Sequence, residues 1–232
     1  MKTCVIIPTY NEANTILAVL ERLRSFSVQV IVIDDGSSDN TGSIAQQAGA
    51  IVLHHSTNKG KGAALITGFE FALKNNFDAV ITMDGDGQHL ADDIPSFLTK
   101  AQTSASQIFI GNRMLTPKNM PRMRLLTNAA MSWFISKIIR QTIPDSQCGF
   151  RLIKREALAK IKLTTHNYET ESELLIKAAR LGITIESVPI KTIYNDNKSG
   201  INPLFDTLRF INFIFNELWI LPRQEKRWLK NS

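Results

Sequence analysis

Short apolar runs that end in polar or glycine residues recur along the first half of the chain, and helix-like periodicity follows each run. This alternation predicts βα units and a parallel sheet, whose strands are buried on both faces. The expected strands are CVIIP, VQVIVIDDG, AIVLHH, FDAVITMDGDG and QIFIGNR, and the expected helical stretches span 15–24, 61–74 and about 124–139. The predicted fold class is α/β, with a mostly parallel sheet flanked by helices.

Polar side chains follow several of these expected strands. Tyr10, Asn11 and Glu12 come after the first strand, Asp35 ends the second, and residues 84–89 end the fourth. In open α/β sheets the carboxyl ends of strands and the helix N-termini meet at one edge, where ligands bind. We therefore expect one crevice to collect these side chains.

The segment MDGDGQH places Asp84 and Asp86 on either side of one glycine. Two carboxylates so close repel each other unless a cation lies between them, and oxygen ligands suit Mg²⁺ or Mn²⁺. Such a metal bridges the phosphates of a nucleotide-sugar donor. The alternative is a solvated acidic turn, because Asp and Gly are ordinary turn residues.

Four other positions have both a functional and a structural interpretation. Asp35 either accepts N–H bonds from a nucleobase or binds a nearby backbone loop, and Asp39 favours helix capping. In NKGKG, Lys59 and Lys61 either meet phosphate or are solvated beside glycines that allow close packing, and the packing interpretation is favoured because Walker A spacing is missing. Arg113 in GNR either grips phosphate or forms a surface salt bridge.

Composition and charge bear on the partners and the cellular compartment of the protein. The formal net charge of +6 fits any anionic partner, but no basic patch interleaved with aromatic residues predicts nucleic-acid binding. The cysteines Cys4 and Cys148 lack the spacing of a zinc site or disulfide framework, which favours a reducing compartment. The apolar run Cys4–Ile7 is too short for a secretory signal, so a cytoplasmic location is expected.

Seven segments in a fixed order resemble family 2 glycosyltransferases with the GT-A fold, and within them the dolichyl- or polyprenyl-phosphate mannosyl or glucosyl synthases. The resemblance runs from Cys4 to about Tyr194. The segments are VIIPTYNE, VIDDGSSDNT, NKGKGAALITGF, MDGDGQH, IGNR, DSQCGFRLIKREAL and SVPI.

This resemblance implies roles for particular residues. The positions that would contact the base and ribose of the donor are Pro8, Tyr10, Glu12, Ile33 and Asp35. Those that would hold metal and diphosphate are Asp84, Asp86 and Gln88, with the backbone of Gly85 beside the nucleotide and Arg113 facing phosphate. Relatives often carry an Arg- and Gly-rich loop after the SVPI-like strand, whereas here Lys198 is the basic candidate. The family inverts the anomeric configuration, which implies direct in-line attack.

The acceptor decides whether a general base is needed. A sugar hydroxyl is a poor nucleophile and needs one, whereas a lipid monophosphate is already ionised near pH 7 and needs cationic positioning. The candidate bases are Asp145, Glu169, Glu171 and Glu173, of which Glu171 is favoured. The candidate cations are Arg113, Arg122, Arg124 and Arg151, although most of these charges can equally be surface or ion-paired residues.

The last part of the sequence favours a lipid acceptor. Residues 204–221 predict a wide-faced amphipathic helix, which is too short and too charged to span a bilayer and would lie in the interface. A basic tail with Trp228 follows it and suits anionic headgroups. The alternative is a helix packed on the core or on a second subunit of a homo-oligomer. We expect a GT-A domain over 1–200 and this element over 201–232.

These observations predict an inverting, Mg²⁺- or Mn²⁺-dependent enzyme that passes a hexose from a UDP- or GDP-sugar to a polyprenyl phosphate, peripheral on the cytoplasmic face of the membrane. No residue distinguishes the nucleotides. The alternatives are transfer to a hydroxyl of a glycan or lipid-linked saccharide, and a catalytically silent nucleotide-binding protein that docks on membranes.

Overall fold

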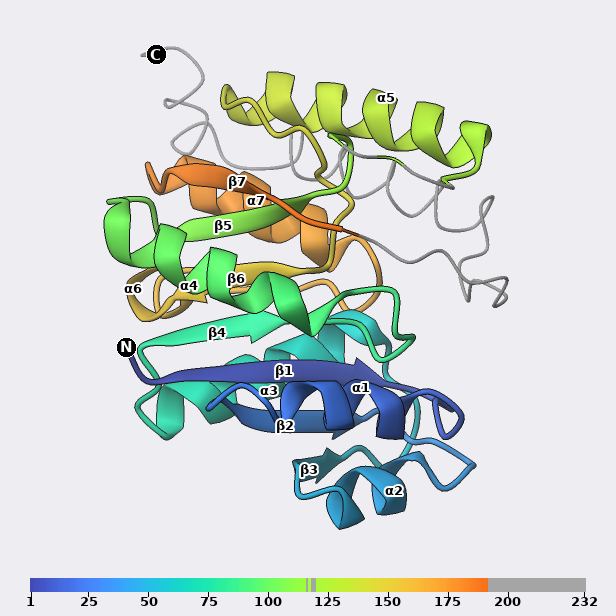
Figure 1. Cartoon of the computed structure of the whole chain (residues 1–232). Coiled ribbons are helices and arrows are strands. Elements are labelled where there is room, and N and C mark those ends of the chain that lie inside the picture. Colours follow the sequence, from blue (N-terminus) through green and yellow to red (C-terminus); the bar gives the residue numbers. More distant parts are fainter. Residues whose placement is uncertain (116, 118–119, 192–232) are drawn as a thin grey trace. The chain divides into compact units, whose positions relative to one another are not determined.

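The computed structural model describes residues 1–115, 117 and 120–191 (Figure 1). The chain divides into two compact units, Met1–Asn195 and Asp196–Ser232, and all described residues belong to the first. Lys198, the amphipathic segment 204–221 and the basic tail lie outside the described residues, so the expectations for them stay sequence-based predictions. No helix in the described part of the chain is long and apolar enough to cross a membrane.

A seven-stranded sheet forms the centre of the described unit, in the order β3-β2-β1-β4-β6-β5-β7. Strand β6 runs antiparallel to both of its neighbours, and the other pairings are parallel. The strands are β1 (Thr3–Thr9), β2 (Gln29–Asp34), β3 (Ile51–His54), β4 (Ala79–Thr82), β5 (Ile108–Asn112), β6 (Arg151–Lys154) and β7 (Ile185–Pro189). The predicted α/β class with a mostly parallel sheet is confirmed.

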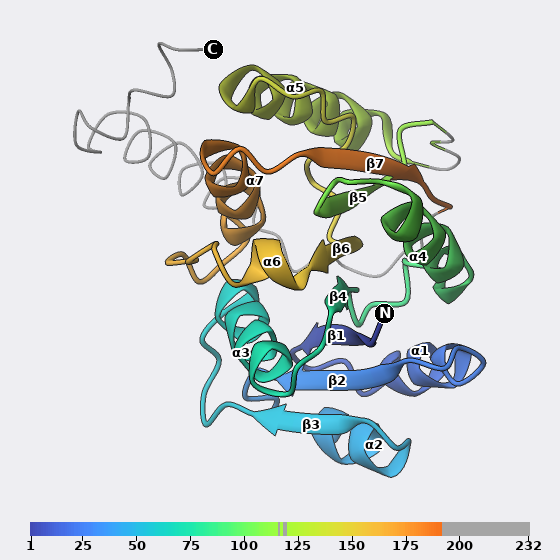
Figure 2. The same cartoon turned by 90° about the vertical axis from the view of Figure 1, so that its left-hand side faces the viewer.

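Helices cover both faces of this sheet. The helices are α1 (Ile16–Leu23), α2 (Thr41–Gln47), α3 (Lys61–Lys74), α4 (Ile94–Thr103), α5 (Arg122–Ile139), α6 (Arg155–Leu158) and α7 (Thr170–Arg180), with a 3₁₀ turn η1 at Ala91–Asp93. Figure 2 shows α1, α2 and α4 on one face and α3, α6 and α7 on the other. Helix α5 lies beyond β7, at the end of the layers, and contacts α7.

Helix α3 packs directly on the central strands of the sheet. Ile6 and Ile33 on the central strands are completely buried, as expected for parallel strands covered on both faces. A Cβ on Gly68 would lie 2.6 Å from Cγ2 of Ile6, so the glycine lets α3 lie directly on the sheet. This close approach places Lys61, the first residue of α3, at the carboxyl ends of the strands.

The structure adds details that the sequence patterns did not provide. Strand β6 was not predicted, because its four residues RLIK begin and end with a charge and show no alternation. Asp39 lies one residue before the N-cap of α2, which is Asn40. It still accepts the Thr41 N–H at 3.0 Å and the Ala13 N–H at 3.2 Å, so it joins the start of α2 to the loop after β1.

Candidate active site

The acidic loop after β4 is held in a fixed shape by its own side chains. Oδ1 of Asp86 accepts the Gln88 N–H at 2.9 Å, and Nδ1 of the buried His89 accepts the Asp84 N–H at 3.2 Å. Burial lowers the pKa of His89 to about 4, so the ring is neutral and can act as this acceptor. His89 also packs against Phe150, with ring centroids 5.2 Å apart. Both carboxylates are therefore presented from a preorganised loop.

Lys61 joins this loop to the beginning of α7. Its Nζ lies 2.6 Å from Oδ1 of Asp84 and 2.8 Å from Oε1 of Glu171. Burial acts to lower the pKa of Lys61, but the charges of Asp84 and Glu171 outweigh it and raise that pKa above its ordinary value. Burial acts to raise the pKa of Asp84, and Lys61 outweighs it and lowers that pKa well below its usual range. Lys61 and Asp84 are therefore both charged at neutral pH.

Asp86 differs from Asp84 in that Lys61 forms its direct ion pair with Asp84. Burial, followed by repulsion from the Asp84 carboxylate, raises the pKa of Asp86 to about 6. The side chain of Asp84 keeps 29% of its surface exposed, and it can be reached from solvent. A second positive charge at this place would therefore be stabilised by both aspartates.

Gly149 lies directly against the carboxylates of Asp84 and Glu171. A Cβ on Gly149 would lie 3.0 Å from Oδ2 of Asp84 and 3.0 Å from Oε1 of Glu171. The oxygens of Asp84 and Glu171 thus come together over a residue with no side chain.

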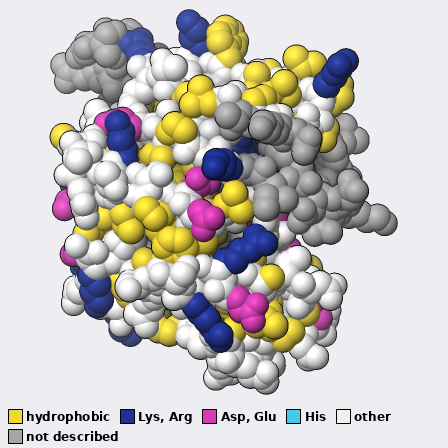
Figure 3. Space-filling view, viewed as in Figure 1, with side chains coloured by type: hydrophobic (Ala, Val, Ile, Leu, Met, Phe, Trp, Pro, Cys, Tyr) yellow, Lys and Arg dark blue, Asp and Glu magenta, His cyan; other side chains and the backbone are white. Residues whose placement is uncertain are grey.

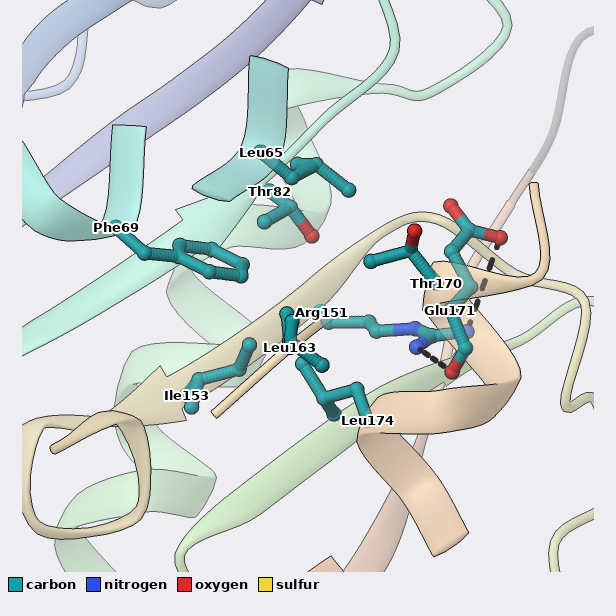
Figure 4. Close-up of a pocket in the computed structure, with 9 residues that line it drawn as sticks. All are labelled: Leu65, Phe69, Thr82, Arg151, Ile153, Leu163, Thr170, Glu171 and Leu174. Carbon is teal, nitrogen blue, oxygen red and sulfur yellow. Dashed lines mark hydrogen bonds and ion pairs between the residues drawn. The ribbon is translucent and has the colours of Figure 1, made fainter. Parts of the chain in front are cut away.

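Arg151 fixes the loop that contains Gly149 and also the start of α7. Its guanidinium donates to the carbonyl oxygens of Ser146, Cys148 and Glu171 at 2.7–2.8 Å. Figure 4 shows its side chain reaching along the small cavity beneath Glu171, with Nη2 3.9 Å from Oε2 of that residue. Arg151 is almost completely buried, so its role here is to position Glu171 rather than to bind an anion.

Arg113 and Asp145 form a buried ion pair at the end of β5. Nε of Arg113 lies 2.6 Å from Oδ2 of Asp145, and Nη2 lies 2.8 Å from Oδ1. The side chain of Arg113 is 6% exposed and that of Asp145 is fully buried. The surface salt bridge considered for Arg113 is thus a buried pair. Both carboxylate oxygens of Asp145 accept hydrogen bonds from Arg113, which argues against Asp145 as the general base.

Glu171 keeps its standing among the other candidate bases. Glu173 is fully buried and accepts bonds from Thr164, Thr165 and Lys177, so it holds the loop before α7 in place. Glu169 occupies the N-cap position of α7 and is half-buried. Glu171 alone among these three is ion-paired to a residue that also contacts Asp84.

The turn after β1 meets the end of β2, where the base and ribose contacts are expected. Pro8 and Ile33 pair in the β1–β2 register, and Tyr10 at the end of β1 is 48% exposed. Thr15 Oγ1 lies 2.7 Å from Oε2 of Glu12 and 2.8 Å from the carbonyl oxygen of Gly85. The turn and the acidic loop are therefore directly connected.

Asp35 binds the backbone loop that leads into α3. Its carboxylate accepts the N–H groups of Lys59 at 3.0 Å and Gly60 at 2.7 Å, and Nδ1 of His55 lies 2.6 Å from Oδ1. The structural interpretation of Asp35 is thus realised.

The family model described as glycosyl transferase family 2 matches residues 4–162. The chain belongs to this family. It is 34% identical over 215 residues to a UDP-N-acetylglucosamine–dolichyl-phosphate N-acetylglucosaminyltransferase of Methanococcus voltae, covering 83% of this chain and 86% of the relative. It is 32% identical over 203 residues to an undecaprenyl-phosphate mannosyltransferase of Micrococcus luteus, covering 82% and 83%.

Solved structures of glycosyltransferases have the same GT-A fold as this family 2 member. Mannosyl-3-phosphoglycerate synthase from Rubrobacter xylanophilus gives a TM-score of 0.73 at 18% identity, covering 98% of this chain and 75% of that one. Glucosyl-3-phosphoglycerate synthase from Mycobacterium tuberculosis, in a complex with Mn²⁺, UDP and phosphoglyceric acid, gives 0.73 at 21%, covering 96% and 80%. The predicted GT-A fold is confirmed.

The glycosyltransferase fold brings together most of the predicted site residues that the structure describes. Asp84, Asp86 and Gln88 share one loop, Lys61 and Glu171 adjoin it, and the turn carrying Glu12 is bonded to it. The description does not reach Lys198, and it shows Arg122 exposed on α5 and Arg124 half-buried.

Sequence reasoning missed the roles of Lys61, His89 and Gly149 in this enzyme. The glycine packing expected around Lys61 is confirmed, because a Cβ on Gly62 would lie 1.9 Å from Oγ1 of Thr170. The solvated interpretation of Lys61 is wrong, because that packing drives its ammonium between two carboxylates. The signal available in the sequence was a lysine placed between two glycines at a helix start.

Proposed function

We propose that this family 2 glycosyltransferase moves a hexose from a UDP- or GDP-sugar to the phosphate of a polyprenyl lipid, with inversion and with the help of Mg²⁺ or Mn²⁺. The observation that carries this proposal is the acidic loop, where Asp84 shares the Lys61 ammonium with Glu171 and the Asp86 carboxylate lies two residues further along. The loop has more negative charge than Lys61 neutralises. A divalent cation would supply the missing positive charge.

The donor set fits such a cation. Within the described residues no group of three or more His, Cys, Asp or Glu side chains is placed to hold a metal. Magnesium is usually bound by one or two carboxylates together with the phosphates of a substrate, so two aspartates are sufficient. Asp84, Asp86 and Gln88 would hold the ion. When bound, it neutralises charge on the departing nucleoside diphosphate.

The donor nucleotide would occupy the turn after β1. Tyr10 offers an exposed ring at this turn, and Pro8 and Ile33 are paired beneath it. Asp35 would accept an N–H of the base while it also holds the backbone of Lys59 and Gly60. Because Thr15 joins this turn to Gly85, the nucleoside and diphosphate positions would be set by one connected piece of backbone.

The acceptor proposal draws on two relatives that are named for transfer to dolichyl phosphate and undecaprenyl phosphate. In the proposed step a phosphate oxygen of the lipid attacks the sugar carbon. The bond from that carbon to the diphosphate breaks, and its electron pair leaves with the nucleoside diphosphate. A lipid monophosphate is largely dianionic near neutral pH, so the step needs no base. The enzyme would act peripherally at the cytoplasmic face of the membrane.

A second candidate is transfer to a hydroxyl of a glycan or lipid-linked saccharide. Glu171 favours it, because this carboxylate is half-buried beside the acidic loop and is oriented by Lys61 and Arg151. A hydroxyl acceptor would need such a general base.

Two experiments test these proposals. A thermal-shift panel of UDP- and GDP-hexoses with MnCl₂ should identify one donor by a metal-dependent rise in melting temperature. Labelled donor should then be offered with polyprenyl phosphate and, separately, with glycan acceptors. Label that appears on a glycan and never on the lipid phosphate would favour the second candidate. Binding without any transfer or donor hydrolysis would instead indicate a catalytically silent protein.

A further inference from the structure

Helix α5 exposes several large apolar side chains. Its buried residues are Asn128, Ser132, Ile135 and Ile139, whereas Met123, Leu126 and Trp133 are 73%, 64% and 64% exposed. The Ser132 hydroxyl accepts the Ser146 N–H at 2.8 Å, which fixes this side of the helix against the loop before β6. A group of large apolar side chains that stay exposed on one helix marks an interaction surface.

The exposed residues form one stripe, which we call the α5 face. It consists of Arg122, Met123, Leu126, Thr127, Ala129, Ala130, Trp133, Phe134 and Lys137. The spacing of Met123, Leu126, Ala130 and Trp133 places them along one side of a helix. Figure 3 shows apolar side chains with Lys and Arg among them along the upper edge, where Figure 1 places α5.

All charged residues of this region are cationic. No Asp or Glu occurs between Ile94 and Pro144, whereas α5 and its C-cap contain Arg122, Arg124, Lys137 and Arg140. The Nζ of Lys137 lies 5.9 Å from the ring centroid of Trp133, so the cation and the aromatic ring occupy neighbouring places on the α5 face. Apolar and aromatic residues flanked by Lys and Arg are the composition of helices that lie in the interface of anionic bilayers.

The segment that contains α5 is connected at both ends to residues beside the active site. Strand β5 ends at Asn112, Arg113 follows it, and α5 begins at Arg122. After α5 the chain returns at Asp145, which pairs with Arg113. Both ends of the α5 segment are therefore tied to one buried ion pair beside the site.

We propose that the α5 face docks on the surface of an anionic lipid bilayer. This inference rests on the proposed function, because such docking would bring a membrane-embedded lipid phosphate to the donor site. The charge pattern favours a bilayer over a second copy of the chain. A two-fold contact would place the same cationic patch against itself, with no carboxylate on α5 to pair with it.

The test measures sedimentation of the full-length protein with vesicles of phosphatidylglycerol and phosphatidylcholine, and with phosphatidylcholine alone. The test variant is Leu126→Gln with Trp133→Gln, and the matched control is Leu17→Gln with Leu181→Gln, which changes side chains 45% and 51% exposed elsewhere. We expect the test variant to lose at least about tenfold in partitioning to anionic vesicles, since two large apolar side chains leave the interface. The control should bind like the parent.

Charge is tested separately with Arg122→Gln and Lys137→Gln. Each should weaken binding to anionic vesicles by about fivefold at low salt, with little effect on neutral vesicles. Without vesicles, the melting temperature and mass of the test variant should equal those of the parent. A drop in melting temperature would show that the α5 face is covered within the folded protein, and loss of a dimer would show that a second copy covers it. Either result overturns the proposal. The proposal also fails if the parent does not bind anionic vesicles, or if the test variant binds them as well as the parent does.

A soluble short-chain isoprenyl phosphate separates this inference from the proposed function. The test variant should transfer sugar to it in buffer as fast as the parent, yet be slower on a long-chain acceptor in vesicles. Absence of transfer from the parent to either acceptor would remove the proposed function and leave the vesicle result to be judged alone. Equal rates of variant and parent on the vesicle acceptor would overturn docking through α5.

Discussion

The ammonium of Lys61 lies 2.6 Å from Oδ1 of Asp84, which is one of the proposed metal ligands. The lysine reaches this position because Gly60 and Gly62 pack α3 tightly against residues 166–170. Its second contact is with Glu171, so one side chain connects the candidate metal ligand to the candidate base. The site is thus partly neutralised before any ligand arrives.

Replacement of this lysine should expose the charge imbalance of the loop. In Lys61→Met, the carboxylates of Asp84 and Glu171 lose their shared cation, so the free energy of unfolding should fall by about 2 kcal/mol without metal. A divalent cation replaces the lost charge, so MnCl₂ should raise the melting temperature of the variant more than that of the parent. Thermal unfolding with and without MnCl₂ measures both effects.

The control for this variant is Lys59→Met, which changes an exposed lysine on the same loop and leaves its backbone bond to Asp35 in place. It should match the parent in both conditions. If Lys61→Met is as stable as the parent and gains no more from manganese, the ammonium is not a substitute for metal charge.

The ionised carboxylate of Asp86 should lower the free energy of unfolding of the metal-free protein. Its folded pKa of about 6 lies above the ordinary 3.8, so the folded state binds an extra proton between these values. Stability from this group is therefore present below about pH 4 and is lost as the pH rises through 6. Asp86→Asn cannot ionise and should be about 1–3 kcal/mol more stable than the parent at pH 7.5 without metal.

Two further measurements define this prediction. The stability advantage of Asp86→Asn should shrink as the pH is lowered from 7.5 toward 4, and the variant should lose the extra stabilisation that nucleotide with manganese gives the parent. A variant that is stabilised by nucleotide and manganese as strongly as the parent would show that Asp86 does not hold the ion.

The fold was largely predictable from the sequence, because parallel strands buried on both faces leave clear apolar runs. Strand β6 was not, because its place between β4 and β5 depends on antiparallel pairing that its four residues do not encode by alternation. The outward apolar stripe of α5 escaped prediction for a related reason. Helical spacing shows that Leu126 and Trp133 share a side, but only tertiary packing shows that this side faces out.

The site was predictable in its acidic loop and less so in its ion pairs. Asp84 and Asp86 are close in sequence, so their repulsion could be deduced directly. Lys61 and Glu171 are far apart in the chain, and their contact depends on how α3 and α7 pack. Likewise, a single sequence does not show that the guanidinium of Arg113 forms an ion pair with Asp145.

This buried ion pair should be a structural requirement of the site. Asp145→Ala would leave the guanidinium of Arg113 in a buried place without its carboxylate, at a cost of about 3–5 kcal/mol. For a domain of this size the melting temperature should drop by roughly 10 °C. Asp145→Asn keeps an acceptor oxygen and should fall less. If Asp145→Asn instead lost activity at full thermal stability, Asp145 would have a chemical role.

Glu171→Gln should reveal which acceptor the enzyme uses. The amide keeps an oxygen for Lys61 and leaves the backbone bond from Arg151 to the carbonyl of residue 171 intact, so folding should change little. It cannot accept a proton, so transfer to a sugar hydroxyl should slow by about 10²–10⁴-fold. Transfer to a polyprenyl phosphate should stay within about tenfold of the parent, because the phosphate is already ionised. Initial rates with each acceptor at saturating donor measure this difference. A loss larger than a hundredfold on the lipid phosphate would mean that the Glu171 carboxylate serves the chemistry even where no proton has to be removed.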